Sequence, residues 1–380
     1  MLRIKTKNLF LNSVLLIYCL VVIAEFYGVF SIRTSQIIMI ILGAASMAYY
    51  CVLRRDLKNL TTKYMVFVSI YILGGFMSWI FNGNADFVEL FWPFAFMGMS
   101  TVLLFGRVST KTTSIVFYIY CILTVILIFQ KGGADYLGGT SSRNSVSIFV
   151  VFFLTMHMVT SFQNKKSISI YYAFVAFITC FSAIGRSGVI TSVIVICIFC
   201  IFRFEKGQSY IRNIKIFLGA VLATIVLYQL IMYFEPELIE NAISNILWRG
   251  LESKRTAIWS DYVSKSFSSF GNWFFGSHIS GTQLLNLYSE NLHNSFLMLH
   301  AKYGMVVFLM VIILIIKSIV AYVKDRNFYF LSAMFICLFR MSFDYTNFNG
   351  LLDTIFLVLL LYPSYSKQVI KYRTEGSYYD

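Results

Sequence analysis

Residues 303–323, YGMVVFLMVIILIIKSIVAYV, hold a single charged side chain in an otherwise mostly apolar run. A helix needs roughly 20 such residues to cross the hydrocarbon core of a bilayer. The whole chain is 58% hydrophobic and 13% charged, whereas soluble domains are about 45–50% apolar and about 25% charged. Comparable runs lie near residues 9–30, 35–53, 64–81, 90–105, 114–129, 146–162, 168–184, 188–204, 216–234, 328–343 and 351–363. The sequence therefore predicts an all-α polytopic membrane protein with about twelve transmembrane helices.

The charge distribution predicts how these helices are oriented. The net charge is +14, and most basic residues fall in alternate connections, while the opposite short connections carry only Arg33, Lys131, Arg143 and Arg186. Positively charged loops stay in the cytoplasm, so both termini are expected there. The excess of basic residues thus reports topology, and it gives little support for a nucleic-acid partner.

One connection is much longer than the others. Residues 235–302 separate about nine predicted spans (1–234) from the last spans and a cytoplasmic tail (303–380), and this connection is expected outside the cytoplasm. Apolar residues recur at helical spacing in it, first from Leu238 to Leu247 and again from Ile258 to Phe270. We therefore expect a large extracytoplasmic helical loop, with two amphipathic helices lying against the bilayer or the bundle.

Besides Arg33, five arginines lie on the predicted outer side, and each of these five is a candidate anion ligand. An arginine at the head of a membrane span is costly unless it is paired, hydrated or engaged by a ligand. Snorkelling to the interface is the alternative explanation for each of them. These arginines are Arg143, Arg186, Arg249, Arg255 and Arg340.

Arg186 and Arg255 are the strongest of the five. Arg186 lies between Gly185 and Ser187 in a turn that leads directly into a predicted span, and a helix N-terminus beside a cation favours anions. Arg255 shares a helix face with Trp259, so it should point inward. A bound anion would neutralise it there, with Glu252 as the competing partner.

His293 is the candidate general base. It lies where the long loop enters the tenth predicted span, and Glu290 stands three residues before it. A carboxylate can orient and tune an imidazole, which titrates near neutral pH. A satisfied structural histidine is the alternative reading.

Other chemistries have less support in the sequence. No carboxylate pair has glycosidase character, and no cluster has metal-ligand spacing, so neither a metal nor a cofactor is expected. The acids of the predicted spans, Glu25 and Asp353, sit near span ends, which argues against a proton-coupled transporter.

The motifs of the long loop resemble the signature of the O-antigen polymerase and O-antigen ligase superfamily. The turn Gly185-Arg186-Ser187-Gly188 resembles the arginine turn of that superfamily, and the topology is similar. The loop motifs are Lys254-Arg255-Thr-Ala-Ile-Trp259, Phe275-Gly276, Leu292-His293-Asn294-Ser-Phe-Leu297 and Lys302-Tyr303-Gly304.

The resemblance implies a multi-span glycosyltransferase of the bacterial cytoplasmic membrane that works on its outer, periplasmic face. Its donor and acceptor would be oligosaccharides on undecaprenyl diphosphate, with no nucleotide sugar and no metal, and a chain-length-determining co-polymerase is a possible partner. A polymerase, for O-antigen or capsule, moves the growing glycan onto a new lipid-linked repeat unit. Arg186 and Arg255 would stabilise the leaving diphosphate, with Arg143, Arg249 and Arg340 as further ligands, and His293 would deprotonate the attacking hydroxyl.

Two alternatives stay open. A ligase uses the same donor but transfers the finished glycan to lipid A–core; only Gly276 and Gly281 remain of the family's glycine-rich stretch before His293, which favours the polymerase. A polysaccharide flippase or other transporter would need charges at mid-depth and repeat symmetry between the halves, and the sequence shows neither.

Overall fold

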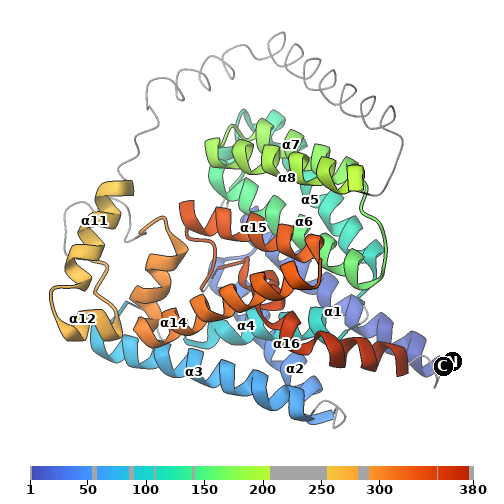
Figure 1. The fold of residues 1–380 in the computed structure, drawn as a ribbon. Coiled ribbons are helices and arrows are strands. Elements are labelled where there is room, and N and C mark those ends of the chain that lie inside the picture. The colour runs from blue at the N-terminus through green and yellow to red at the C-terminus, as the bar shows by residue number, and fades with distance from the viewer. Residues whose placement is uncertain are drawn as a thin grey trace.

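The computed structural model describes residues 2–53, 58–84, 90–106, 108–138, 142–205, 255–280, 291–348 and 350–375. Within these ranges the chain forms α-helices and one short 3-10 helix, and no β-strand (Figure 1). The helices are α1 (Leu2–Phe26), α2 (Ile32–Leu53), α3 (Lys58–Asn82), α4 (Trp92–Phe105), α5 (Thr110–Lys131), η3 (Ala134–Tyr136), α6 (Arg143–Gln163), α7 (Tyr171–Ser182), α8 (Arg186–Glu205), α11 (Arg255–Ser266), α12 (Phe270–Phe275), α14 (Ser295–Lys324), α15 (Phe328–Phe343) and α16 (Asp353–Glu375).

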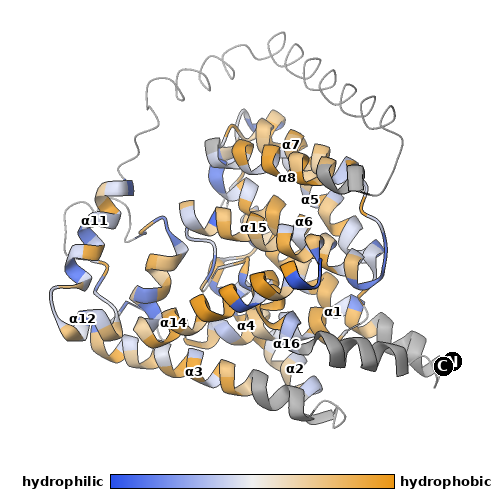
Figure 2. Ribbon diagram, viewed as in Figure 1, coloured by the Kyte–Doolittle hydropathy of each residue, from blue (hydrophilic) through white to orange (hydrophobic). Residues whose placement is uncertain are grey.

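The all-α, membrane-type character of the prediction is confirmed for the described residues. Every predicted apolar run within them lies mainly in a helix, and apolar residues dominate the helix bundle (Figure 2). The run at 216–234 and the proposed loop helix at 238–247 lie outside the described residues. In the described part of the chain, five helical stretches are long and apolar enough to cross a membrane: Ile32–Tyr50, Met65–Asn82, Thr110–Lys131, Arg143–Gln163 and Ser295–Lys324. The other apolar helices are shorter, so the number of spans stays a prediction.

Helix α6 occupies the centre of the bundle. It packs against α5, α7, α8 and α15, and 78% of its apolar window is buried, compared with 28% for α14. Its first turn is fixed by a capping box, in which Ser142 Oγ accepts from Ser145 N while Ser145 Oγ accepts from Ser142 N. Such reciprocal capping satisfies amide groups that a helix start leaves unpaired, and it sets the position of the residues that follow.

Helices α2 and α4 cross with their backbones in contact. A methyl group added at Gly43 would overlap the backbone of α4 at Phe94 and Ala95, and one added at Gly98 would overlap Gly43 itself. Small residues allow this close approach between membrane helices, where dispersion contacts replace the hydrophobic effect as the driving force. The pair α2–α4 is therefore intolerant of any larger side chain at either glycine.

Helix α14 begins earlier than the run at 303–323 predicts, and it is interrupted. Asn294 caps its start by accepting from the amides of Phe296 and Leu297. Gly304 then has φ 74° and ψ 178°, which breaks the helix into a short first piece and a long second piece. Just before the break, the Ala301 carbonyl accepts hydrogen bonds from Ser78 and Asn82 in the last turns of α3 and from Asn84 just after it.

The second amphipathic helix of the long loop is partly as predicted. Helix α11 buries Ile258 and Tyr262, but it ends at Ser266, so Phe267 and Phe270 leave its buried face. The reason is local polar bonding: Ser268 Oγ donates to the Lys265 carbonyl, and Ser269 caps the new helix α12. Figure 1 places α11 and α12 at the opposite end of the molecule from the N-terminal end of α1 and the C-terminal end of α16.

Candidate functional site

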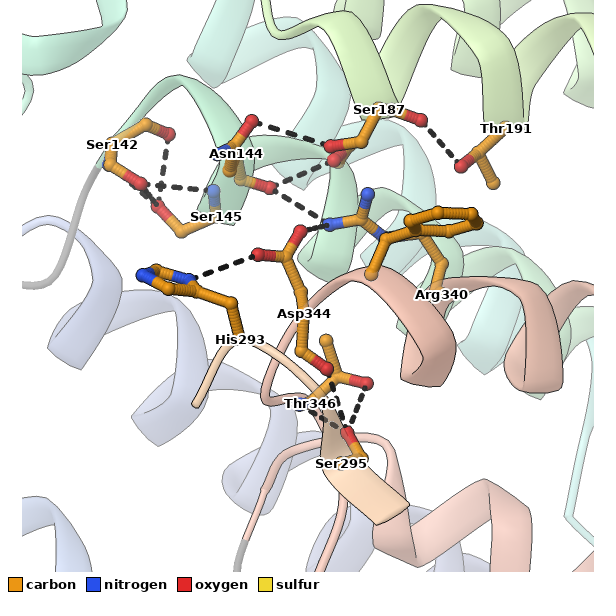
Figure 3. Close-up of polar contacts among 12 residues, drawn as sticks. Ser142, Asn144, Ser145, Ser187, Thr191, His293, Ser295, Arg340, Asp344 and Thr346 are labelled. Carbon is orange, nitrogen blue, oxygen red and sulfur yellow. Dashed lines mark hydrogen bonds and ion pairs between the residues drawn. The ribbon is translucent and has the colours of Figure 1, made fainter. Parts of the chain in front are cut away.

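Three of the basic side chains singled out in the sequence converge on one carboxylate, that of Asp344, at the C-terminal end of α15. Arg340 Nη2 donates to Asp344 Oδ2 over 2.8 Å, and Arg255 Nη2 lies 3.4 Å from Oδ1. His293 Nδ1 lies 3.8 Å from the same Oδ1 (Figure 3). The first turn of α11, the turn before α14 and the last turn of α15 thus each bring one basic residue to a shared acid.

Arg340 is the most deeply buried of the three basic side chains in this cluster. Its side chain is fully buried, and Nη2 also lies 3.5 Å from the Asn144 carbonyl oxygen at the start of α6. Nε and Nη1 are buried, and no described residue forms a hydrogen bond with either of them. Because a buried guanidinium needs a counter-charge, Arg340 holds the Asp344 carboxylate in place.

Arg255 reaches the cluster from the first turn of α11. Its Nη1 donates to the Phe343 carbonyl over 2.5 Å, and Nη2 pairs with Asp344. The side chain is 22% exposed, so it points inward as the sequence predicts. Its anionic partner in the structure is Asp344, a contact that was not predicted from the sequence. Glu252, the competing partner in that analysis, lies outside the described residues.

His293 is held at the cluster by an unusual backbone conformation. Its φ is 48°, in the left-handed region that few non-glycine residues adopt. The amide of His293 donates to Asn291 Oδ1, and the next residue, Asn294, caps α14. The turn thereby presents the imidazole to Asp344, while Glu290 lies outside the described residues.

The connection after α15 is bonded to the start of α14. Ser295 Oγ donates to the Asp344 carbonyl and accepts from the Thr346 amide. Asn294 Nδ2 donates to the Ser342 carbonyl. Asn294 directly follows His293, and the Asp344 carbonyl is itself one of the bonded groups. These hydrogen bonds therefore fix His293 and Asp344 relative to each other.

Arg186 starts α8 next to the same network, although its side chain is not among those described. A Cβ at Gly185 would lie 2.5 Å from the Arg143 carbonyl oxygen, so the turn touches the start of α6. Ser187 Oγ donates to Asn144 Oδ1 over 3.3 Å. Asn144 therefore lies between the N-terminus of α8 and Arg340 (Figure 3).

The remaining two arginines are placed differently. Arg143 Nε pairs with Asp135 over 2.7 Å, with 43% and 44% of the two side chains exposed, so it lies on the surface in an ion pair of its own. Arg249 lies outside the described residues.

A buried tyrosine–histidine contact attaches α11 to α14. His300 Nε2 lies 2.8 Å from the Trp273 carbonyl, so it is the protonated nitrogen, and Nδ1 accepts from Tyr262 Oη over 2.8 Å. Burial raises the pKa of Tyr262, which keeps the hydroxyl protonated as a donor. Since Arg255 is in the same helix as Tyr262, this contact helps to position Arg255.

The cluster has more positive than negative charge. Among the residues that the structure describes, two guanidinium groups face one carboxylate, and Asp344 is only 8% exposed. A partly buried excess of positive charge favours an anionic ligand, because unpaired charge in an apolar setting is costly. Across the described ranges, no three His, Cys, Asp or Glu side chains come together as a metal site would require.

Comparison of the chain with protein-family models and with curated proteins finds no match.

Proposed function

We propose that the protein is a glycosyltransferase of the bacterial cytoplasmic membrane that polymerises lipid-linked oligosaccharide repeat units. The observation that carries the proposal is the meeting of Arg255, Arg340 and His293 on Asp344. Transfer of a glycan from a diphosphate to a hydroxyl requires a general base for the hydroxyl and a positively charged site for the diphosphate. The cluster would supply both, side by side. The resemblance of the motifs around these residues to O-antigen polymerases and ligases supplies the substrate class.

The arginines serve the leaving group. When the bond from the anomeric carbon to the diphosphate oxygen breaks, negative charge accumulates on the diphosphate. Guanidinium groups bind phosphate oxygens in pairs and stay charged in an apolar setting. Arg255, which is partly exposed, would contact the diphosphate together with Arg186, while the buried Arg340 acts through Asp344.

His293 serves the attacking hydroxyl. With Nδ1 facing Asp344, Nε2 would accept the proton from the acceptor sugar as its oxygen bonds to the anomeric carbon. The carboxylate stabilises the imidazolium that forms, as in other histidine–aspartate pairs. The products are the elongated glycan on undecaprenyl diphosphate, free undecaprenyl diphosphate and one proton held on His293.

The reaction would take place on the outer face of the membrane, and both termini would lie in the cytoplasm. Donor and acceptor would be repeat units on undecaprenyl diphosphate, for O-antigen or capsule, and modal length would involve a co-polymerase. Arg143 and Arg249 would be peripheral ligands.

The test is a gene deletion combined with reconstitution. Loss of a polymerase leaves lipid A–core carrying one repeat unit, whereas loss of a ligase leaves bare core with long chains still on undecaprenyl diphosphate. Loss of a flippase traps units inside the cell. Purified protein in proteoliposomes should elongate lipid-linked repeat units without nucleotide sugar, and failure of wild-type protein to do so in the presence of both substrates would refute the polymerase.

A further inference from the structure

The corner between α11 and α12 exposes large apolar side chains at the end of the molecule that carries the site. Phe267 is 71% exposed and Phe270 is 73% exposed, and Val263 in the preceding turn is 40% exposed. We name these three residues the aromatic corner. A surface that stays in water rarely presents such side chains together.

The aromatic corner continues an apolar surface that begins on α3. A Cβ at Gly271 would lie 2.5 Å from the Phe81 ring, and the rings of Phe81 and Phe275 are 4.8 Å apart. Helix α12 therefore rests on the last turn of α3 (Figure 1). In the second half of α3, further large apolar side chains are exposed, within a stretch long and apolar enough to span a membrane: Leu73, Phe76, Met77 and Ile80.

Polar bonds on the inner side of α12 fix which side faces out. Asn82 Nδ2 donates to the carbonyls of Phe275 and Gly276 over 3.1 and 2.8 Å, and Asn84 Nδ2 donates to Ser277 over 2.7 Å. These amides at the end of α3 also bond to the broken segment of α14. The corner thus cannot rotate its aromatic side chains inward without breaking several buried hydrogen bonds.

We propose that the aromatic corner inserts into the lipid leaflet in which α3 ends and anchors the loop helices at the membrane interface. Aromatic side chains concentrate at this depth of a bilayer, and an apolar helix face binds there through its buried area. Continuity with the exposed strip of α3 identifies the occupant as acyl chains. The inference is independent of the proposed sugar transfer.

The experiment measures how deeply single nitroxide labels lie in proteoliposomes of phosphatidylethanolamine and phosphatidylglycerol. Labels go on Phe267→Cys and Phe270→Cys in a background without the native cysteines. Leu73→Cys, on the exposed face of α3, is the lipid control, and Asp135→Cys, in the exposed ion pair with Arg143 and away from α11, is the aqueous control. At positions 267 and 270 we expect collisions with oxygen to exceed collisions with a water-soluble nickel chelate, as at position 73.

Two results would overturn the proposal. Nickel accessibility equal to that at position 135 would place the corner in water, and low accessibility to both reagents would show that protein covers it. If the cysteine-free background does not fold, Phe267→Trp and Phe270→Trp in the native chain replace it. Their fluorescence should then be quenched by brominated acyl chains beyond the wild-type level, and no added quenching would contradict the insertion.

Discussion

Asp344 contacts three basic side chains, so its charge is expected to matter for stability as well as for turnover. In Asp344→Asn the fully buried Arg340 loses its counter-charge, and breaking a buried ion pair from one side costs roughly 3–5 kcal/mol. We expect a clear fall in the thermal unfolding midpoint of the purified protein.

The matched control for this change is Asp135→Asn. It breaks the pair with Arg143, in which both side chains are more than 40% exposed, and exposed pairs contribute about 0–1 kcal/mol. Equal effects of the two substitutions would contradict the burial argument.

His293→Asn tests the general base separately from the backbone. Asparagine tolerates the left-handed conformation that His293 adopts but cannot take a proton, so turnover should fall roughly 10²–10⁴-fold while the unfolding midpoint stays near that of wild type. His278→Asn, an exposed histidine, is the control. Unchanged elongation of lipid-linked glycan in His293→Asn would remove the base from the mechanism.

Arg255→Lys tests geometry at constant charge. Lysine cannot contact the Phe343 carbonyl, Asp344 and a diphosphate with one planar group, as arginine can. The loss of a charged hydrogen bond, about 1.5–3 kcal/mol, predicts roughly 10–150-fold lower kcat/KM. Arg33→Lys, at an exposed arginine in the first turn of α2 that has no role in the site, should be close to wild type, and a similar loss there would show a general effect of lysine.

The sequence indicated three of the four cluster residues but not the acid that joins them. Arg255, Arg340 and His293 stand out because charge is rare at the ends of apolar runs. In the sequence, Asp344 looks like an ordinary residue at the end of a helix. The one signal that could have identified it is its spacing of four residues from Arg340, which allows an ion pair on one helix face. Its contacts with Arg255 and His293 join segments far apart in the chain, which a single sequence cannot show.

At the scale of elements, apolar runs located the helices well but not their interruptions. Gly304 lies in a run that reads as continuous, because a glycine alone does not end a helix. What breaks α14 is the backbone of Phe274 in α12, which occupies the space that a side chain at residue 304 would need. Tertiary packing therefore decides the break.

Gly304→Ala separates this packing from backbone strain. A Cβ there would lie 2.6 Å from the Phe274 carbonyl oxygen, and φ is 74°. Gly133, with φ 154° and ψ 160°, lies in the same region that essentially only glycine adopts, and a Cβ there would meet only the Tyr136 ring at 3.5 Å. Gly133→Ala therefore reports strain alone, about 1–3 kcal/mol. We expect Gly304→Ala to lower the unfolding midpoint distinctly more, and equal shifts would mean that α12 yields to the methyl group.

At the scale of the whole molecule, the arrangement of charges predicts sidedness. Both termini should be cytoplasmic, as should the connection after α6 with Lys165 and Lys166, whereas the connection after α5 should be outside. Alkaline phosphatase fused after Leu137 should be active and fused after Asn164 inactive, with a fluorescent-protein fusion giving the reverse pattern. If the phosphatase is active at both positions, or inactive at both, α6 does not span the membrane.

The glycine contact between α2 and α4 bears on how the chain is made. Helix α4 leaves the ribosome only after the whole of α3, so α2 must wait in the membrane with its contact surface unfilled. During that interval α2 is held by whatever the insertion machinery or the lipid offers, and α3 has to be kept from taking the place of α4. The order of synthesis and the order of packing thus differ at this step.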